Sequence, residues 1–474
     1  MEGELRMVMT INYYDLSVDE IKAKVKKLQK RSRNRNQLGF NIPMDNVKKQ
    51  NNDFNETIVR VEGNIPVDLE ISDNDRYLFI SYDQSSLTHG FHKYPAKFFP
   101  ELPRWIIQKY SNIGDLVLDP FSGSATANVE ALLNKRNSVG IDIEPFARFL
   151  AKVKTTPLNI DELCSKNEEL LKKIINFHPS KIDTSDIPTF PYIENWFNKE
   201  IISELAYIRK IIINLDCSPE IRDFYLTCFS SILRSVSNAD NNCTRTVIRK
   251  KLNKQVYPSD ALRRFVENLF SWSPKIIEFS KKVPTNYFSE FPLNMDARNI
   301  GFDNNTFDLA LTSPPYINAV DYPRTHQLES YWLGLANGSL APQKKLHIGT
   351  ESVISSEYND FHVTGIDSID LVLYNIFKID KRRAYIAFKY FEDMRQNLIE
   401  VNRVLKPGAR YVIVVGNNKI RGHVVENWKY LMEMSQYLDF EIENYFGSEI
   451  IKHFIKVPRE ERINTDWVLI LRKR

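Results

Sequence analysis

The chain has 474 residues, of which 43% are hydrophobic and 26% are charged, an ordinary balance for a globular protein with a core domain and a second lobe. No apolar run approaches the ~18 residues that span a bilayer, and no secretory signal is recognisable, so we expect a cytoplasmic protein without a membrane partner. Four cysteines without paired C-x-x-C spacing indicate neither a metal site nor a disulfide framework.

The net charge of +4 says little by itself, because the positive charge is concentrated in two segments. The first follows the capping box Ser17-Val18-Asp19-Glu20, where apolar residues recur at helical spacing among lysines and arginines as far as Arg35. A solvated basic helix and a phosphate-contacting arm both fit this pattern. The rest of residues 1–85 is expected to hold an Asn-rich stretch and two strands, near 58–61 and 77–81.

A strand, a tight turn and a helix are predicted in residues 116–135, within a first core segment that spans residues 86–160. The apolar strand ends in the acid and small-residue turn Asp119-Pro120-Phe121-Ser122-Gly123-Ser124-Ala125-Thr126. Such a turn brings backbone N–H groups close to a ligand at the carboxyl edge of a parallel sheet. A second strand ends in Asp142 and Glu144, about 20 residues after the turn, the offset expected for an acid that binds ribose hydroxyls.

Residues 161–290 change to helix-length amphipathic segments, which are too long for a loop within a compact α/β unit. We therefore expect an inserted helical lobe. The second basic segment, residues 244–264, lies inside it and begins with Arg245 and Arg249 at helical spacing. The lobe is expected to recognise nucleic acid, with phosphate contacts from Arg245, Arg249, Lys250, Lys251 and Lys254. The alternative is a dimerisation or partner surface with a solvated basic segment, in which case the insertion at residues 317–380 would read the bases.

A buried strand at residues 307–311 stops at Thr312-Ser313-Pro314-Pro315-Tyr316, where two prolines force a rigid, extended turn. The turn offers carbonyls, a hydroxyl and an aromatic ring in fixed directions, a suitable cradle for a flat ring that bears an amine. An ordinary Pro-Pro loop would explain the motif if it stood alone. Combined with the glycine turn and the offset acid, it predicts a cofactor and substrate site.

The remaining segments complete the second part of the core, residues 291–474. Asp296 is expected to end a third strand, and residues 317–380 form a further insertion. A helix over 390–405 leads through the turn Lys406-Pro407-Gly408 to a strand over 411–415. Two last strands, over 440–445 and 467–471, are expected to close the sheet as an antiparallel hairpin at its edge.

These segments together resemble the amino-group DNA methyltransferases that use S-adenosylmethionine, and most closely the Ser-Pro-Pro-Tyr branch associated with N4-cytosine methylation. The resemblance covers residues 89–160, including His92-Lys93-Tyr94-Pro95-Ala96-Lys97-Phe98, and resumes over 296–316 and 390–416. The family usually has Gly where this chain has Ala125, so the turn must accept a Cβ atom there. The implied fold is α/β and Rossmann-like, the class I methyltransferase type, with a doubly wound, mostly parallel sheet.

The resemblance also implies roles for individual residues. Ser313 and the Pro314 carbonyl would accept hydrogen bonds from the target amine, beside Pro315, and Tyr316 would stack on a base that has left the duplex. Asp142 is the first candidate for the ribose hydroxyls and Glu144 the second, while Asp296 would lie near the adenine amino group. The residues expected to bind S-adenosylmethionine are Lys97, Phe98, Asp119, Pro120, Phe121, Gly123, Ser124, Thr126, Asp142, Glu144 and Asp296.

The leading hypothesis is a sequence-specific DNA N4-cytosine methyltransferase that acts on double-stranded DNA without a metal. A cognate restriction endonuclease is a candidate partner, and no oligomeric state is predicted. Adenine N6 is the nearest alternative target, since it is also an exocyclic amine; Ser313 favours cytosine, because adenine enzymes more often carry Asp or Asn there. An RNA guanine-N2 methyltransferase and a non-catalytic nucleic-acid-binding protein are further alternatives.

Overall fold

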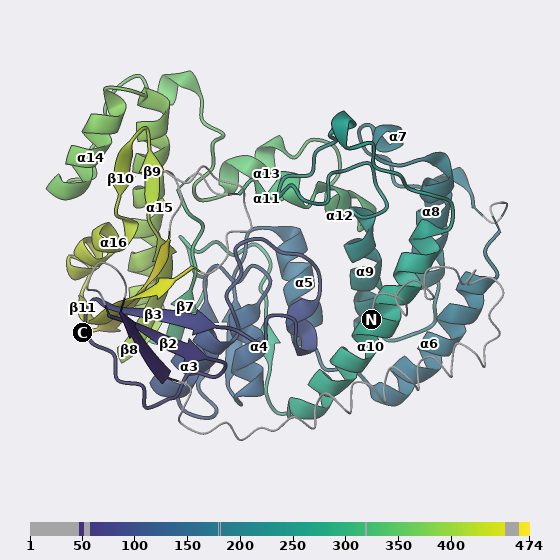
Figure 1. Cartoon of the computed structure of the whole chain (residues 1–474), viewed down its shortest axis with the longest axis horizontal. Helices are drawn as coiled ribbons and strands as arrows, with labels where there is room; N and C mark the ends of the chain where they lie inside the picture. Colours follow the sequence, from purple (N-terminus) through teal and green to yellow (C-terminus); the bar gives the residue numbers. More distant parts are fainter. Residues whose placement is uncertain (1–46, 52–56, 179, 181, 318–319, 451–463) are drawn as a thin grey trace.

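The computed structural model describes residues 47–51, 57–178, 180, 182–317, 320–450 and 464–474. This part of the chain forms a ten-stranded sheet with helices on both faces and a helical lobe beside it (Figure 1). The strand order is β1-β2-β3-β11-β12-β8-β7-β4-β5-β6. The predicted fold class, a doubly wound and mostly parallel α/β sheet with an inserted helical lobe, is confirmed.

The centre of the sheet is parallel and buried on both faces, which is why its strands are continuous apolar runs. Because side chains alternate along a strand, Val117 and Leu309 pack under one helical layer, whereas Leu118 and Ala310 pack under the other. The parallel strands of this half are β8 (Leu405–Gly416), β7 (Phe307–Thr312), β4 (Leu116–Asp119) and β5 (Asn137–Gly140), and the short β6 (Ser289–Glu290) forms its edge. The covering helices are α3 (Glu101–Tyr110) and α4 (Thr126–Leu133) on the first face, and α15 (Lys381–Val404) and α16 (Asn427–Gln436) on the second.

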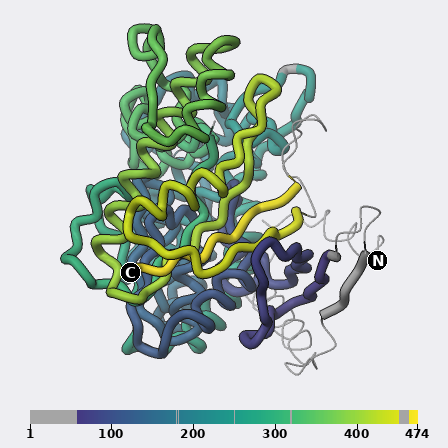
Figure 2. The backbone as a smooth tube through the Cα atoms, turned by 90° about the vertical axis from the view of Figure 1, so that its left-hand side faces the viewer, coloured from purple at the N-terminus to yellow at the C-terminus, as the bar shows by residue number. Residues whose placement is uncertain are grey.

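The last two strands, β11 (Phe440–Glu449) and β12 (Thr465–Lys473), form the expected antiparallel hairpin, but the prediction that they end the sheet is wrong. β3 (Asp75–Ile80) pairs in parallel with β11, and Tyr77 packs edge-on against Phe446 across that pairing. β2 (Thr57–Glu62) and β1 (Val47–Asn51) continue the sheet outward. Figure 2 shows these N-terminal strands next to the last strands of the chain.

The helical lobe occupies the right of Figure 1 and has its own apolar core. Phe224 and Phe229 are fully buried in that core, and α9 packs on α5 (Pro145–Thr155) at the sheet. The lobe consists of α6 (Ile160–Ile175), α7 (Ile193–Trp196), α8 (Lys199–Ile213), α9 (Pro219–Leu233) and α10 (Asp260–Lys282).

The basic segment between α9 and α10 is a loop, so the helical spacing predicted for Arg245 and Arg249 is wrong. Ala239 pairs with Ile248 in an isolated antiparallel bridge, and the short 3₁₀ helix Lys250–Leu252 follows. The Arg234 guanidinium donates to three consecutive loop carbonyls, those of Cys243, Thr244 and Arg245. We call residues 240–258 the basic loop.

Residues 317–380 divide between the lobe and the sheet. Trp332 packs edge-on against Phe197 and Phe229 of the lobe, with ring centroids 5.8 and 5.9 Å away. The last helix of the segment, α14, packs instead on α15. The helices of this segment are α11 (Tyr322–Thr325), α12 (Gln327–Trp332), α13 (Ala341–Leu346) and α14 (Asp367–Phe377).

Three further expectations differ from the structure in detail. β6 ends at Glu290, and Asp296 lies beyond it in a turn bridged to Asn299. The Lys406-Pro407-Gly408 segment lies inside β8, where the register with β7 shifts. The basic helix predicted after Ser17 lies outside the described residues. Among the helices described, none is long and apolar enough to cross a membrane.

Candidate functional site

A cleft opens where β4, β5 and β7 end. β5 and β7 flank β4. The chain passes from β4 to β5 on one side and from β7 to β8 on the other, so the cleft lies at the point where the strand order reverses, which is where an open α/β sheet usually binds its ligand. The residues predicted from the sequence that line it are Lys97, Phe98, Asp119, Pro120, Phe121, Gly123, Ser124, Thr126, Asp142, Asp296, Ser313 and Pro315. Glu144, Pro314 and Tyr316 are not among its lining residues.

Asp119 connects the two sequence motifs at the floor of the cleft. Its Oδ1 atom accepts the Phe121 backbone N–H at 3.1 Å and the Thr312 hydroxyl at 2.6 Å. The carboxyl is buried, and burial, with a smaller contribution from the charge of Asp142, raises its pKa to about 7. The glycine turn after β4 and the Pro-Pro motif after β7 are therefore held in a fixed relation.

The turn after β4 uses left-handed backbone at two positions. Gly123 has φ of +47°, and a Cβ atom there would lie 3.1 Å from the Tyr94 ring. Ala125 has φ of 60° and ψ of 36° and precedes the first turn of α4, so it adopts the conformation that a glycine would take with less strain. The left-handed conformation of a residue other than glycine lowers the free energy of unfolding by roughly 1 kcal/mol, and the buried turn tolerates this strain.

The wall of the cleft has unpartnered polar atoms that fit a polar ligand. The side-chain hydroxyls of Ser122 and Ser124 are buried and have no hydrogen-bond partner within the described part of the chain. Phe98 and Phe121 add apolar surface beside them. Hydroxyls and backbone N–H groups can donate hydrogen bonds to the polar parts of a nucleoside with an amino-acid tail, and aromatic faces can pack against its ring. The residues present therefore fit S-adenosylmethionine.

Asp142 and Glu144 differ sharply in position. Asp142 lines the cleft and accepts the N–H groups of Gly123 at 2.9 Å and Glu144 at 2.8 Å. Glu144 is buried away from the cleft, with its Oε2 atom 3.4 Å from Nε2 of His347. Burial alone would lower the pKa of His347, but the bond to Glu144 outweighs it and raises that pKa above the ordinary value. The geometry favours Asp142 as the ligand-binding acid.

Asp296 lines the cleft in a two-point ion pair with Arg298, whose Nε and Nη2 atoms lie 2.9 and 2.6 Å from its two oxygens. Burial raises the pKa of Asp296, but the Arg298 guanidinium outweighs burial and holds it below the ordinary value. Asp393 in α15 accepts a further bond from Arg298. Any contact of Asp296 with a ligand is thus made by an ionised carboxylate held in place.

The Pro-Pro motif presents Ser313 and Pro315 to the cleft, whereas Tyr316 points elsewhere. The Tyr316 hydroxyl donates to Oδ1 of Asp466 in β12 at 2.9 Å, and its ring packs against the core beneath the sheet. Stacking of Tyr316 on a substrate base therefore stays a prediction, and it would require this side chain to turn.

Several cleft residues were not assigned a role from the sequence. Tyr94 and Tyr322 line it with stacked rings, 5.8 Å between centroids, and His347 comes from the insertion. Tyr94 lies inside the segment that carries the family resemblance, which was a usable signal; the insertion residues offered none. Lys97 lines the cleft, and its ammonium group donates to the carbonyls of Gln84 and His89, so it also ties the loop together.

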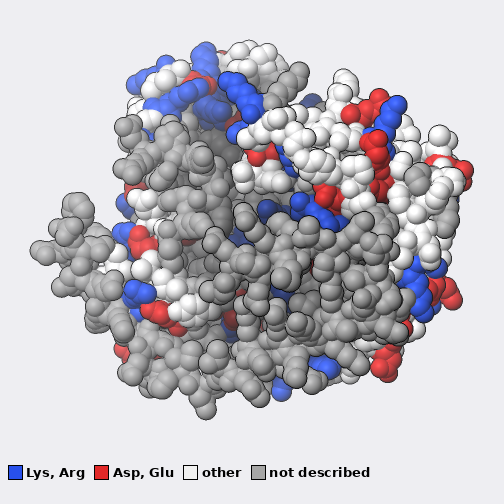
Figure 3. Space-filling view, turned by 45° about the vertical axis from the view of Figure 1, so that its right-hand side comes forward, with Lys and Arg blue, Asp and Glu red and all other residues white. Residues whose placement is uncertain are grey.

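Four of the five predicted DNA contacts fall into two groups, and the side chain of Lys250 lies outside the described part of the chain. Arg245, Arg249 and Lys251 are exposed on the basic loop, with Arg249 3.4 Å from Asp240. Lys254 instead donates to the carbonyls of Arg234 and Ala239 and to Asn241, and burial lowers its pKa to about 8. Its charge stabilises the loop, and it is a poor candidate for a phosphate contact. Figure 3 shows a group of Lys and Arg side chains at the upper left of one face and smaller groups elsewhere on that face.

Comparison with known proteins agrees with this site. Residues 5–152 match the N6/N4 family model described as DNA methylase. The type II methyltransferase M.MvaI of Kocuria varians is 27% identical over 74% of this chain and 82% of its own length. M.BsoBI of Geobacillus stearothermophilus, also a type II methyltransferase, is 24% identical over 73% of this chain and 77% of its own length.

Among solved structures, an S-adenosylmethionine-dependent methyltransferase from Methanosarcina mazei aligns with 12% identity over 81% of this chain and 98% of that chain, with a TM-score of 0.28. A candidate DNA modification methylase from Thermus thermophilus, complexed with S-adenosyl-L-methionine, aligns with 22% identity over 20% of this chain and 39% of that chain, with a TM-score of 0.15. The family model and the two curated relatives thus make this chain similar to the N6/N4 amino-group DNA methyltransferases, and they do not specify which amine is methylated.

Replacement of Asp142 by Asn is expected to weaken S-adenosylmethionine binding far more than replacement of Glu144 by Gln. A charge-assisted bond contributes roughly 1.5–3 kcal/mol, or ~10–100-fold in affinity, and only Asp142 reaches the cleft. Isothermal titration calorimetry measures both variants, with Glu144→Gln as the matched control. An equal or larger loss in Glu144→Gln would reverse the assignment.

Asp119 should release a proton when the cofactor binds. Its pKa of about 7 leaves it protonated in weakly acidic solution, and a cationic ligand nearby stabilises the carboxylate, so affinity should rise with pH through that value. Asp119→Asn preserves the acceptor for Thr312 and cannot titrate. Calorimetry at a pH slightly below 7, in buffers of different ionisation enthalpy, should show more proton release for the wild type; equal release by both proteins would contradict the assignment.

Proposed function

We propose that this protein is a type II DNA methyltransferase that transfers a methyl group to the exocyclic N4 amine of cytosine, within a specific site of double-stranded DNA. The observation that carries the proposal is the position of Ser313. It lies on the cleft wall directly after Thr312, whose hydroxyl is bonded to the acid of the cofactor turn. An amine acceptor and a cofactor cradle thus share one cleft.

The chemistry asks for acceptors more than for a strong base. The lone pair of an exocyclic amine is conjugated into the ring, so hydrogen-bond acceptors at its protons are needed to draw the nitrogen towards tetrahedral geometry. The Ser313 hydroxyl and the Pro314 carbonyl are proposed for this, on a turn that two prolines make rigid. S-adenosylmethionine supplies the methyl group from its sulfonium. Transfer is direct and in line, onto a base flipped out of the duplex.

The helical lobe is proposed as the DNA-recognition surface, because the basic loop is attached to the cleft. The Thr246 hydroxyl donates to the Thr325 carbonyl at 2.7 Å, and Gln327 donates to the carbonyl of Thr246. Thr325 ends α11, the helix whose Tyr322 lines the cleft. Arg245 and Arg249 are therefore close in the chain to the residue that joins the lobe to the site.

The base and the atom are tested together by expressing the protein in cells without DNA methylation and mapping modified bases by single-molecule sequencing. N4-methylcytosine at one recurring sequence is the expected result. N6-methyladenine would select the alternative target. Unmodified DNA, with S-adenosylmethionine bound in calorimetry, would favour an RNA substrate, and absence of cofactor binding would favour a non-catalytic role.

Ser313→Ala should lower the methylation rate by ~10²-fold or more, since it removes a contact at the reacting amine. Cofactor affinity should stay within about threefold, because the cofactor turn is untouched. Single-turnover methylation and calorimetry measure the two effects. The matched control is Ser356→Ala at an exposed position far from the motif in the chain; a wild-type rate in Ser313→Ala would refute the role.

Reversal of both Arg245 and Arg249 to Glu should weaken DNA binding and flatten its salt dependence, because each lost phosphate contact lowers the slope by roughly one. Cofactor binding should not change. The control reverses Lys172 and Lys281, which are exposed on α6 and α10, with the same change in net charge. If the two double variants bind DNA alike at every salt concentration, the basic loop does not contact DNA.

A further inference from the structure

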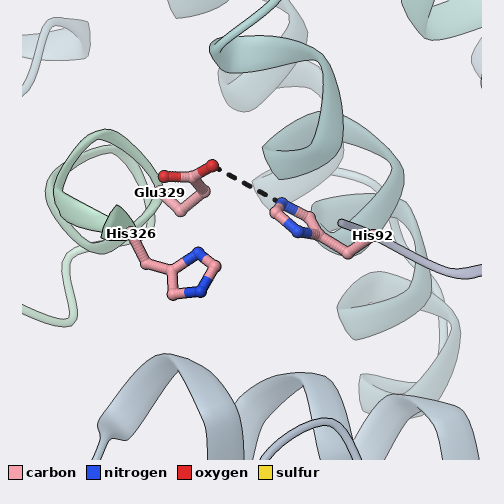
Figure 4. A group of neighbouring side chains, drawn as sticks. All are labelled: His92, His326 and Glu329. Carbon is pink, nitrogen blue, oxygen red and sulfur yellow. Dashed lines mark ion pairs between the residues drawn. The ribbon is translucent and has the colours of Figure 1, made fainter. Parts of the chain in front are cut away.

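Three metal-binding side chains converge behind the cleft, in the interior of the protein (Figure 4). His92 comes from the loop before α3, and His326 and Glu329 come from the start of α12 and from within it. One ligand atom of each lies within 4.8 Å of the others. All three are buried, with exposed fractions of 8%, 2% and 3%.

The hydrogen bonds of this cluster are incomplete. Both ring nitrogens of His326 and the Oε2 atom of Glu329 have no hydrogen-bond partner in the described residues. Buried polar atoms are normally satisfied, and each unsatisfied one costs about 1–3 kcal/mol. Only one of the two His326 nitrogens can face the cluster, and together with the unpartnered Nε2 atom of His92 and the carboxylate of Glu329 it leaves room for a bound species that the protein itself does not supply.

The orientation of His92 fits a metal ligand. Its Nδ1 atom lies 3.0 Å from the Lys93 carbonyl, which can only accept, so Nδ1 carries the proton. Nε2 is then the lone-pair atom, 3.6 Å from Oε1 of Glu329. Two ligands of tetrahedral zinc lie about 3.3 Å apart, and a metal-bound histidine typically donates its other N–H to a backbone carbonyl.

We infer that His92, His326 and Glu329 bind a divalent transition metal, with zinc the best match to two imidazoles and one carboxylate. The site is structural: it joins the loop before α3 to α12, two segments far apart in the sequence. The fourth position falls to water or to the Ser230 carbonyl, which faces the His92 ring.

The charge environment restricts the site. Burial lowers the pKa of His92 and His326 and raises that of Glu329 to about 7, while the charge of the neighbouring Arg234 favours the deprotonated form of all three. Zinc with one carboxylate would leave one positive charge beside Arg234.

The metal would also support the cofactor cleft. The His326 ring stacks on Tyr94, with centroids 5.0 Å apart and planes 14° apart. Tyr94 in turn lines the cleft and packs against Gly123. Fixing His326 would therefore fix one wall of the cleft, at a distance from any reacting atom.

The test measures metal content in the full chain, purified without a histidine tag. Elemental analysis should find close to one equivalent of zinc per wild-type chain, and at least a tenfold loss in Glu329→Gln and His326→Ala. His178→Ala, at an exposed histidine, is the matched control and should retain the metal. Chelation should lower the midpoint of thermal unfolding and weaken S-adenosylmethionine binding in the wild type, and added zinc should restore both.

Two results would overturn the inference. The wild type could contain no stoichiometric metal and show no change in unfolding with zinc or with a chelator, in which case the cluster is a metal-free group of neutral side chains. Alternatively, both cluster variants could retain the full equivalent, which would place the metal elsewhere. If a variant fails to fold, the response of the wild type to chelator and zinc decides the question.

Discussion

One buried carboxyl, that of Asp119, holds the two halves of the site together. In a parallel sheet the carboxyl ends of the strands lie at one edge, but the turns that follow are irregular and have no regular inter-strand hydrogen bonds to position them. The bond from Thr312 to Asp119 supplies that positioning at 2.6 Å, inside the protein, where a hydrogen bond is electrostatically stronger than in water. The glycine turn after β4 and the Pro-Pro turn after β7 are consequently held together as one unit.

The inserted segments are attached to the carboxyl edge of the sheet by contacts away from the cleft. Trp332 ties one part of the insertion into the lobe core, and Thr246 ties the basic loop to α11. Neither contact involves a reacting group. The surface of the lobe can therefore vary while the cleft keeps its shape, a separation of function from scaffold that is common on α/β folds.

The parts of the fold that the sequence predicted are those that depend on local patterns. Buried parallel strands read as apolar runs, and Gly123 and Pro315 impose backbone geometry within a few residues of themselves. The offset along the chain indicated the pair Asp142 and Glu144, with Asp142 as the first candidate, and the cleft-lining position of Asp142 agrees with that order.

What the sequence did not predict depends on contacts between distant segments. Nothing near Tyr316 indicates that its hydroxyl meets Asp466, and nothing near Lys254 indicates three acceptors from the preceding loop. The two N-terminal strands were recognised, but their pairing with β11 was not, because periodicity gives the faces of a strand and not its neighbour. Asp296 and Arg298 are only two residues apart, but their ion pair was not predicted, because no sequence pattern indicates side-chain directions in an irregular turn.

The pairing of β3 with β11 has a consequence for any shortened version of this protein. All the motifs for cofactor and amine binding lie after residue 85, so trimming the chain there looks harmless on the sequence alone. It would strip β11 of its neighbour and uncover Phe446, which Tyr77 and Phe79 now flank. A bare strand edge with an aromatic patch is a template for intermolecular pairing. The N-terminal strands thus cover the aromatic edge of β11 and prevent it from pairing with another molecule.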